Sequence, residues 1–173
     1  MNSWFEFALL TWFLTMLPGI DTAQVLRSSI KGGPRVAYLT VLGIMGGVWI
    51  WGIAAAIGVS AILLASEKIY LAFKVIGALY LLYLGLSMIR EGRKAKGLVI
   101  GSQSQFDSPR KALTRAFMVT FTNPKNGAFY VAVLPQFLPE NMNAILAGFL
   151  LSTIHNACVF IWFSGVIYLT NTA

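Results

Sequence analysis

The sequence predicts an all-α membrane helical bundle with five spans, and two observations carry this prediction. Of the 173 residues, 57% are apolar and only 11% are charged, whereas ordinary soluble domains carry charge on about a quarter of their residues. The apolar residues also come in runs of about 20, the length that a helix needs to cross a bilayer. A mean hydropathy of +0.73 agrees with both observations. We therefore expect one integral membrane domain over residues 1–173.

Five apolar runs are long enough to span a membrane. They are residues 4–26, 36–65, 69–89, 112–138 and 144–169. The first run is expected to stay in the mature protein, because no Lys or Arg precedes it and no small-x-small cleavage site follows it. The runs form a first group, residues 1–90, and a second group, residues 112–173, joined by a basic linker, residues 90–111.

Basic residues are concentrated on alternate connections between the runs. The chain has 13 Lys and Arg against 6 Asp and Glu. Most of the cations lie after the first run or around the linker: Arg27, Lys31, Arg35, Arg90, Arg93, Lys94, Lys96, Arg110, Lys111 and Arg115. Cytoplasmic loops retain Lys and Arg, so we expect the N-terminus outside and both basic loops inside. The positive charge thus reports orientation in the bilayer, with contact to anionic lipid and none expected to nucleic acid.

The two runs of greatest interest are interrupted by proline beside charged and polar residues. Proline removes a helix donor and clashes with the preceding turn, so each run is expected to form two half-helices joined inside the bilayer. Such irregular backbone is tolerated only where it is buried in protein or lines a cavity. The candidate site residues at the two breaks are Pro18, Gly19, Asp21, Thr22 and Gln24, and Asn123, Pro124, Lys125 and Asn126.

Each break is suited to start a new half-helix that could bind a substrate. Asn123 is a favourable N-cap and Pro124 suits the first helical position. Asp21 is expected to cap the other half-helix, with Gln24 placed to complete a capping-box-like pair. Free N–H groups at a helix start attract carboxylate, and Asp21 could hold an ammonium, so the pair of breaks would suit a zwitterion.

The alternative interpretation is structural. Asp21 then only caps a kinked helix, and Lys125 extends to an interface or pairs with a carbonyl. Against this, an ionised side chain at membrane depth costs on the order of 2.5–3.5 kcal/mol on insertion scales, so two of them at two breaks favour a function. By the expected topology the two broken runs have opposite orientations, a pattern typical of an inverted repeat with its site at the midplane.

Other side chains bear on the function class. His155 lies in the fifth run, where it could relay protons or form a hydrogen bond between helices. Cys158 is the single cysteine, so no disulfide or redox pair is expected. The sequence offers no metal cluster and no nucleophile with a base, so we expect neither a cofactor nor an enzyme.

The second run has small and aromatic residues with distinct expected roles. Gly43, Gly47, Gly52 and Gly58 predict close packing within the bundle, with a homo-oligomer contact as the alternative. Trp49 and Trp51 fall near the centre of the run, so they face lipid or line a cavity wall.

Four motifs in order resemble the lysine exporter (LysE/RhtB-type) amino-acid efflux family. The first two are Pro18-Gly19-Ile20-Asp21-Thr22, followed by Val25-Leu26-Arg27-Ser28-Ser29 with Gly32-Gly33, and Gly77-Ala78-Leu79-Tyr80-Leu81-Leu82-Tyr83-Leu84-Gly85. The others are Asn123-Pro124-Lys125 and Leu134-Pro135-Gln136-Phe137. The family usually has a second proline in place of Ile20, and Asp or Asn in place of Asp21.

The resemblance implies a secondary transporter that exports amino acids or close derivatives across the bacterial inner membrane, driven by the proton gradient. It also implies a sixth span, so the expected architecture is a 3+3 inverted repeat that lacks its sixth helix. On that basis the alternative function is a non-transporting accessory subunit or an inactive transporter fragment.

Overall fold

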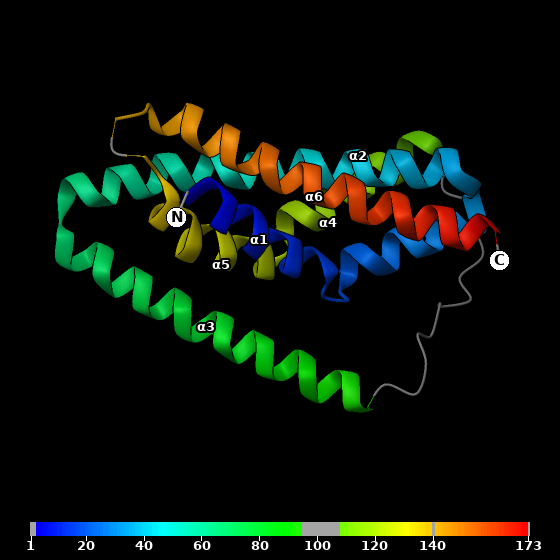
Figure 1. Ribbon diagram of the computed structural model, residues 1–173, viewed down its shortest axis with the longest axis horizontal. Helices are drawn as coiled ribbons and strands as arrows, with labels where there is room; N and C mark the ends of the chain where they lie inside the picture. The colour runs from blue at the N-terminus through cyan, green and yellow to red at the C-terminus, as the bar shows by residue number, and fades with distance from the viewer. Residues whose placement is uncertain (1–2, 95–107, 140, 173) are drawn as a thin grey trace.

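The computed structural model describes residues 3–94, 108–139 and 141–172 as a bundle of helices (Figure 1). The middle of the predicted basic linker, residues 95–107, lies outside the described residues. The helices are α1 (Ser3–Met16), α2 (Ile20–Ala65), α3 (Glu67–Lys94), α4 (Pro109–Thr122), α5 (Pro124–Val133), the 3-10 helix η1 (Leu134–Phe137) and α6 (Ala144–Thr172). Every element of the described chain is helical, so the all-α prediction is confirmed there.

Two of the described helices are long and apolar enough to cross a membrane by length and composition. They are α2, over residues 20–58, and α6, over Ala144–Thr172; α1 is a shorter apolar helix. The predicted spans at residues 4–26 and 112–138 are each interrupted near their prolines, the first between α1 and α2 and the second between α4 and α5. The full count of five spans therefore stays a prediction.

The first two predicted spans are joined by a kink instead of a loop. α2 continues through the expected connection, and its only non-helical residue is Gly33, with φ 74° and ψ −179°. That φ lies in the left-handed region that glycine adopts without steric cost, and the following Pro34 lacks an N–H to continue the helix. We call residues 20–33 the short limb of α2 and residues 34–65 its long limb.

The long limb of α2 lies against α4 and α6, and α1 lies beside α6 (Figure 1). α3 turns back from the end of α2 and diverges from the bundle, with its contacts on α5 and α2. The core contains fully buried aromatic and aliphatic side chains such as Phe7, Tyr130, Ile44 and Leu151. This arrangement places the two helix breaks, at residues 17–19 and at 123, inside the same bundle.

Small residues bring the long limb close to its neighbours, as the glycine pattern predicts. A Cβ on Gly43 would lie 2.3 Å from the Leu113 carbonyl oxygen on α4. A Cβ on Gly52 would lie 2.5 Å from the Cβ of Ser152 on α6. Gly58 differs, because a Cβ there would meet nothing within 4 Å. Packing within the bundle is thus confirmed for Gly43 and Gly52 but does not extend to Gly58.

The contact between α2 and α6 can be tested with two matched substitutions. Gly52→Ala should lower the free energy of unfolding by about 1–3 kcal/mol, because the added methyl group overpacks the interface. Gly58→Ala makes the same chemical change in open space and should leave stability equal or slightly raised. Thermal unfolding in detergent measures both. Equal stability of the two variants would contradict the close approach of these helices.

Candidate functional site

The first break separates α1 from α2 and brings Asp21 to a helix start. α1 ends at Met16, and α2 begins at Ile20. The amide of Ala23 donates to the Gly19 carbonyl at 3.0 Å, so this bond closes the first turn of α2. Asp21 therefore lies inside the first turn, where the helix dipole favours a carboxylate.

The predicted capping pair of Asp21 and Gln24 needs correction. α2 starts at Ile20, one residue before Asp21, so Asp21 is not the N-cap of this helix. The Asp21 carboxylate instead accepts a hydrogen bond at 3.0 Å from the Thr120 hydroxyl on α4. The Gln24 side-chain nitrogen is buried and has no hydrogen-bond partner within the described part of the chain. Asp21 thus connects the two halves of the bundle.

The second break confirms the predicted helix start at Asn123 and Pro124. α4 ends at Thr122, α5 begins at Pro124, and the Asn123 side chain accepts from the Lys125 amide at 3.0 Å. The next two amides, of Asn126 and Gly127, both donate to the Asn123 carbonyl, at 3.1 and 3.2 Å. Proline has no N–H, so the first turn of α5 has no free amide in this conformation. The expectation that these amides bind a carboxylate is therefore wrong for this state.

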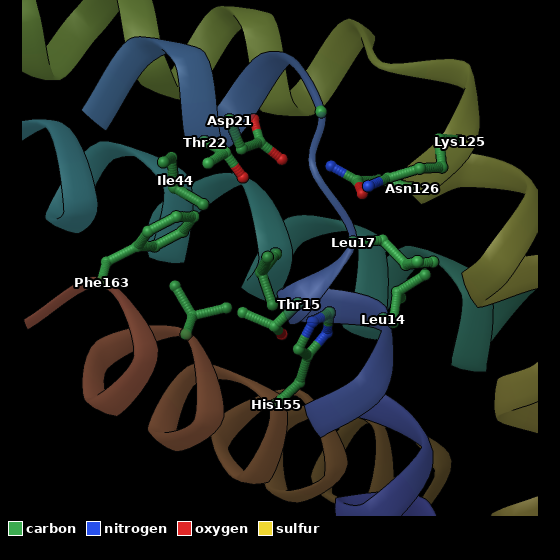
Figure 2. Close-up of a pocket in the computed structure, with 13 residues that line it drawn as sticks. Leu14, Thr15, Leu17, Asp21, Thr22, Ile44, Lys125, Asn126, His155 and Phe163 are labelled. Atoms are coloured by element: carbon green, nitrogen blue, oxygen red, sulfur yellow. The ribbon is translucent and has the colours of Figure 1, made fainter. Parts of the chain in front are cut away.

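A small cavity of about 30 Å³ lies where the two breaks face each other (Figure 2). Six of the predicted site residues line it: Gly19, Asp21, Thr22, Lys125, Asn126 and His155. The other four, Pro18, Gln24, Asn123 and Pro124, are not among its lining residues. Apolar side chains such as Ile44 and Phe163 complete the wall. A water molecule needs roughly 10–15 Å³ of such space, so the cavity holds about two waters and this conformation has no room for an amino acid.

Lys125 extends from α5 to the α1–α2 break on the opposite side of the cavity. A Cβ on Gly19 would lie 3.3 Å from the Lys125 ammonium nitrogen, so the glycine leaves the space for this approach. Asp21 is near enough to interact electrostatically with Lys125. Figure 2 shows Lys125 and Asn126 directed at the segment between α1 and α2. Lys125 therefore lies inside the bundle and does not extend to an interface.

His155 forms the hydrogen bond between helices that was one of its two expected roles. Its Nδ1 lies 2.8 Å from the Tyr130 hydroxyl on α5, and both side chains are buried. Phe129 packs edge-on against the imidazole, with 5.8 Å between ring centroids. The neighbouring Asn156 donates from Nδ2 to the Met45 carbonyl on α2 at 3.1 Å. The role of His155 as a proton relay stays a prediction.

Three contributors to this region were missed by the sequence analysis or left undecided by it. Thr120, which binds Asp21, and Tyr130, which binds His155, carry no motif signal, since each partner is distant in the sequence. Trp51 was left between a lipid-facing role and a cavity wall. Its ring lines an open groove beside α5, so the choice between the two roles stays a prediction. Among the described residues, no group of three or more His, Cys, Asp or Glu could hold a metal ion.

Comparison with known proteins places the chain in a family. The model of the LysE type translocator family matches residues 12–173. The uncharacterized membrane protein YrhP of Bacillus subtilis is 25% identical over 179 residues, covering all of this chain and 85% of the relative. The homoserine/homoserine lactone efflux proteins of Salmonella typhimurium and Salmonella typhi are each 30% identical over 135 residues.

Coverage of these efflux proteins is partial. The alignment takes in 78% of this chain and 64% of each Salmonella protein, so the chain spans somewhat less than two thirds of their length. No solved structure matches this chain. The family match over residues 12–173 shows that the chain is a membrane protein of the LysE type translocator family, whose members are transporters and not enzymes.

Proposed function

We propose that this protein exports amino acids or close derivatives across the bacterial inner membrane, from a site between its two broken helices. The observation that carries the proposal is the meeting of opposite charges, Asp21 and Lys125, at a cavity enclosed by both breaks. The names of the Salmonella relatives, homoserine/homoserine lactone efflux proteins, support this substrate class.

The substrate ammonium is bound by Asp21 in this proposal. The Thr120 hydroxyl orients the carboxylate through its 3.0 Å hydrogen bond, which leaves the other carboxylate oxygen for the ligand. A hydrogen bond to an ionised group is stronger than one between neutral groups. Homoserine and its lactone share the ammonium, so Asp21 serves both kinds of substrate.

The other end of the substrate is bound by Lys125. The amides at the start of α5 already have partners, so the Lys125 ammonium is the group left to receive a carboxylate. A lactone presents a neutral carbonyl at that place and gains less from the positive charge. Lys125 therefore favours substrates with a free carboxylate, whereas Asp21 is required by all of them.

The mutual attraction of Asp21 and Lys125 accounts for the stability of the empty site. Buried charges are costly unless they are paired, and removal of one partner leaves the other uncompensated. In the empty protein the two side chains compensate each other electrostatically. A zwitterion replaces this interaction with two of its own, so charge balance is kept in both states.

Transport requires a change of conformation, because a cavity of about 30 Å³ cannot admit an amino acid. We propose that residues 1–90 and 112–173 are inverted repeats that rock against each other around the site. In this proposal the N-terminus lies outside, the basic loops lie in the cytoplasm, and the proton gradient drives export through protonation at Asp21 or His155.

The role of Asp21 is tested by Asp21→Ala in cells loaded with the standard amino acids, homoserine and homoserine lactone. Export, measured by mass spectrometry of the medium, should fall by on the order of 100-fold, because the variant leaves a buried cation without a partner. Glu6→Ala is the matched control, since Glu6 is a carboxylate on α1 that does not line the cavity. Wild-type export by the Asp21 variant, at equal membrane abundance, would contradict the proposed site.

The role of Lys125 is tested by comparing export of a substrate that has a free carboxylate with export of one that lacks it. Lys125→Met keeps the length of the side chain and removes the charge, so export of homoserine should fall by about tenfold more than export of its lactone. Lys68→Met, at an exposed position near the start of α3, is the control and should export both compounds normally. Equal loss for both compounds would show that Lys125 acts on the fold and not on the carboxylate.

A further inference from the structure

The α4–α5 break exposes backbone carbonyls that need partners from elsewhere in the bundle. An unpaired carbonyl in the bilayer interior costs several kcal/mol. The Thr120 carbonyl accepts from the Asn123 amide and from the Asn126 side chain, both at 3.3 Å. The Phe121 carbonyl accepts at 2.9 Å from the indole N–H of Trp51, which comes from the long limb of α2. A tryptophan from another helix thus supplies the donor for one carbonyl of the break.

The indole of Trp51 also packs on both sides of the break. On the α4 side of the break, the centroids of the Trp51 and Phe121 rings lie 6.1 Å apart at an interplanar angle of 35°. After it, the indole covers Gly127 so closely that a Cβ there would lie 2.7 Å from the Trp51 Cη2 atom. Glycine is therefore required at this position for the indole to reach the Phe121 carbonyl.

The first turn of α5 lies between the small site cavity and an open groove. Lys125 and Asn126 line the small site cavity. Pro124, Gly127 and Ala128, which share the other face of the helix at spacings of three and four residues, line an open groove of about 380 Å³. Its remaining wall includes Trp51 and, from α3, Gly77 and Tyr80. The turn that carries the lysine therefore has free space behind it.

We propose that Trp51 is a positioning residue of the transport site. Its hydrogen bond to the Phe121 carbonyl and its contact with Gly127 hold the first turn of α5 so that Lys125 and Asn126 face the substrate. The open groove behind that turn gives it the space to move back when a substrate enters the site cavity. This inference rests on the proposed function, because it assigns Trp51 a role in placing the residues that bind the substrate.

Trp49 offers a matched control on the same helix. Its indole N–H donates at 3.0 Å to the Thr153 hydroxyl on α6, and its ring stacks on Phe149 with 5.9 Å between centroids. Trp49→Phe and Trp51→Phe therefore each remove one interhelical hydrogen bond and keep an aromatic ring. Only the second substitution affects the α4–α5 break, so a difference between them isolates the role of position 51.

The first test measures transport kinetics of both variants with the best substrate of the loaded-cell experiment. Trp51→Phe should raise KM by about tenfold, because a carbonyl at membrane depth loses its donor, with the maximal rate within about twofold of wild type. Trp49→Phe should leave KM unchanged. A purely structural role for Trp51 would instead lower the maximal rate, through loss of folded carrier, at an unchanged KM, and that result would overturn the inference.

The second test needs no substrate and so separates this inference from the proposed function. Hydrogen–deuterium exchange of the wild-type protein in lipid nanodiscs should show protected amides at Lys125, Asn126 and Gly127. Trp51→Phe should accelerate their exchange by about tenfold, and Trp49→Phe should not. Gly127→Ala, which displaces the indole, should reproduce the effect, and combining it with Trp51→Phe should add little further.

The two proposals fail in different ways. Normal KM and normal exchange in Trp51→Phe would overturn the positioning role even if Asp21→Ala abolishes export. Conversely, absence of export by the wild-type protein would overturn the proposed function, while faster exchange in Trp51→Phe alone would still establish that Trp51 holds the break. Equal amide exchange at Lys125, Asn126 and Gly127 in the two tryptophan variants would refute the role of Trp51 at the break.

Discussion

The constraint on which the rest of this structure depends is that broken helix backbone inside a bilayer must find its hydrogen-bond partners within the protein. At the α4–α5 break, Asn123 caps the new helix through its side chain and main chain. Trp51 from α2 supplies the donor that the preceding carbonyl lacks. The break is therefore part of the packed bundle, and its geometry depends on helices far away in the sequence.

Small residues make these partnerships geometrically attainable. The long limb of α2 approaches α4 at Gly43 and α6 at Gly52 so closely that a methyl group on either glycine would collide with its neighbour. In a membrane, where lipid is as apolar as leucine, such close approach is a main source of helix association. It also lets short side chains such as Thr120 reach across to another helix, as its bond to Asp21 shows.

Local chemistry predicted the start of α5, whereas contacts between distant residues were beyond the sequence. Asn123 and Pro124 specify the α5 start because capping depends on residues next to each other. The partner of Asp21 could not be predicted, since Thr120 is 99 residues away and the choice between capping and pairing is made by tertiary packing. The connection between the first two runs was expected to be a loop, but it is a kink inside α2. The kink lies at Gly33, which has a positive φ.

One side chain that forms a hydrogen bond at the second break, Asn126, also faces the site, and this overlap explains how binding acts on the protein. Asn126 lines the cavity and donates to the Thr120 carbonyl, while the Thr120 hydroxyl holds Asp21. A ligand shifts a conformational equilibrium only if it interacts differently with the two states. In the proposed mechanism, a substrate that binds Asn126 competes with its hydrogen bond to the Thr120 carbonyl, so the binding energy acts directly on the helix geometry that alternating access must change.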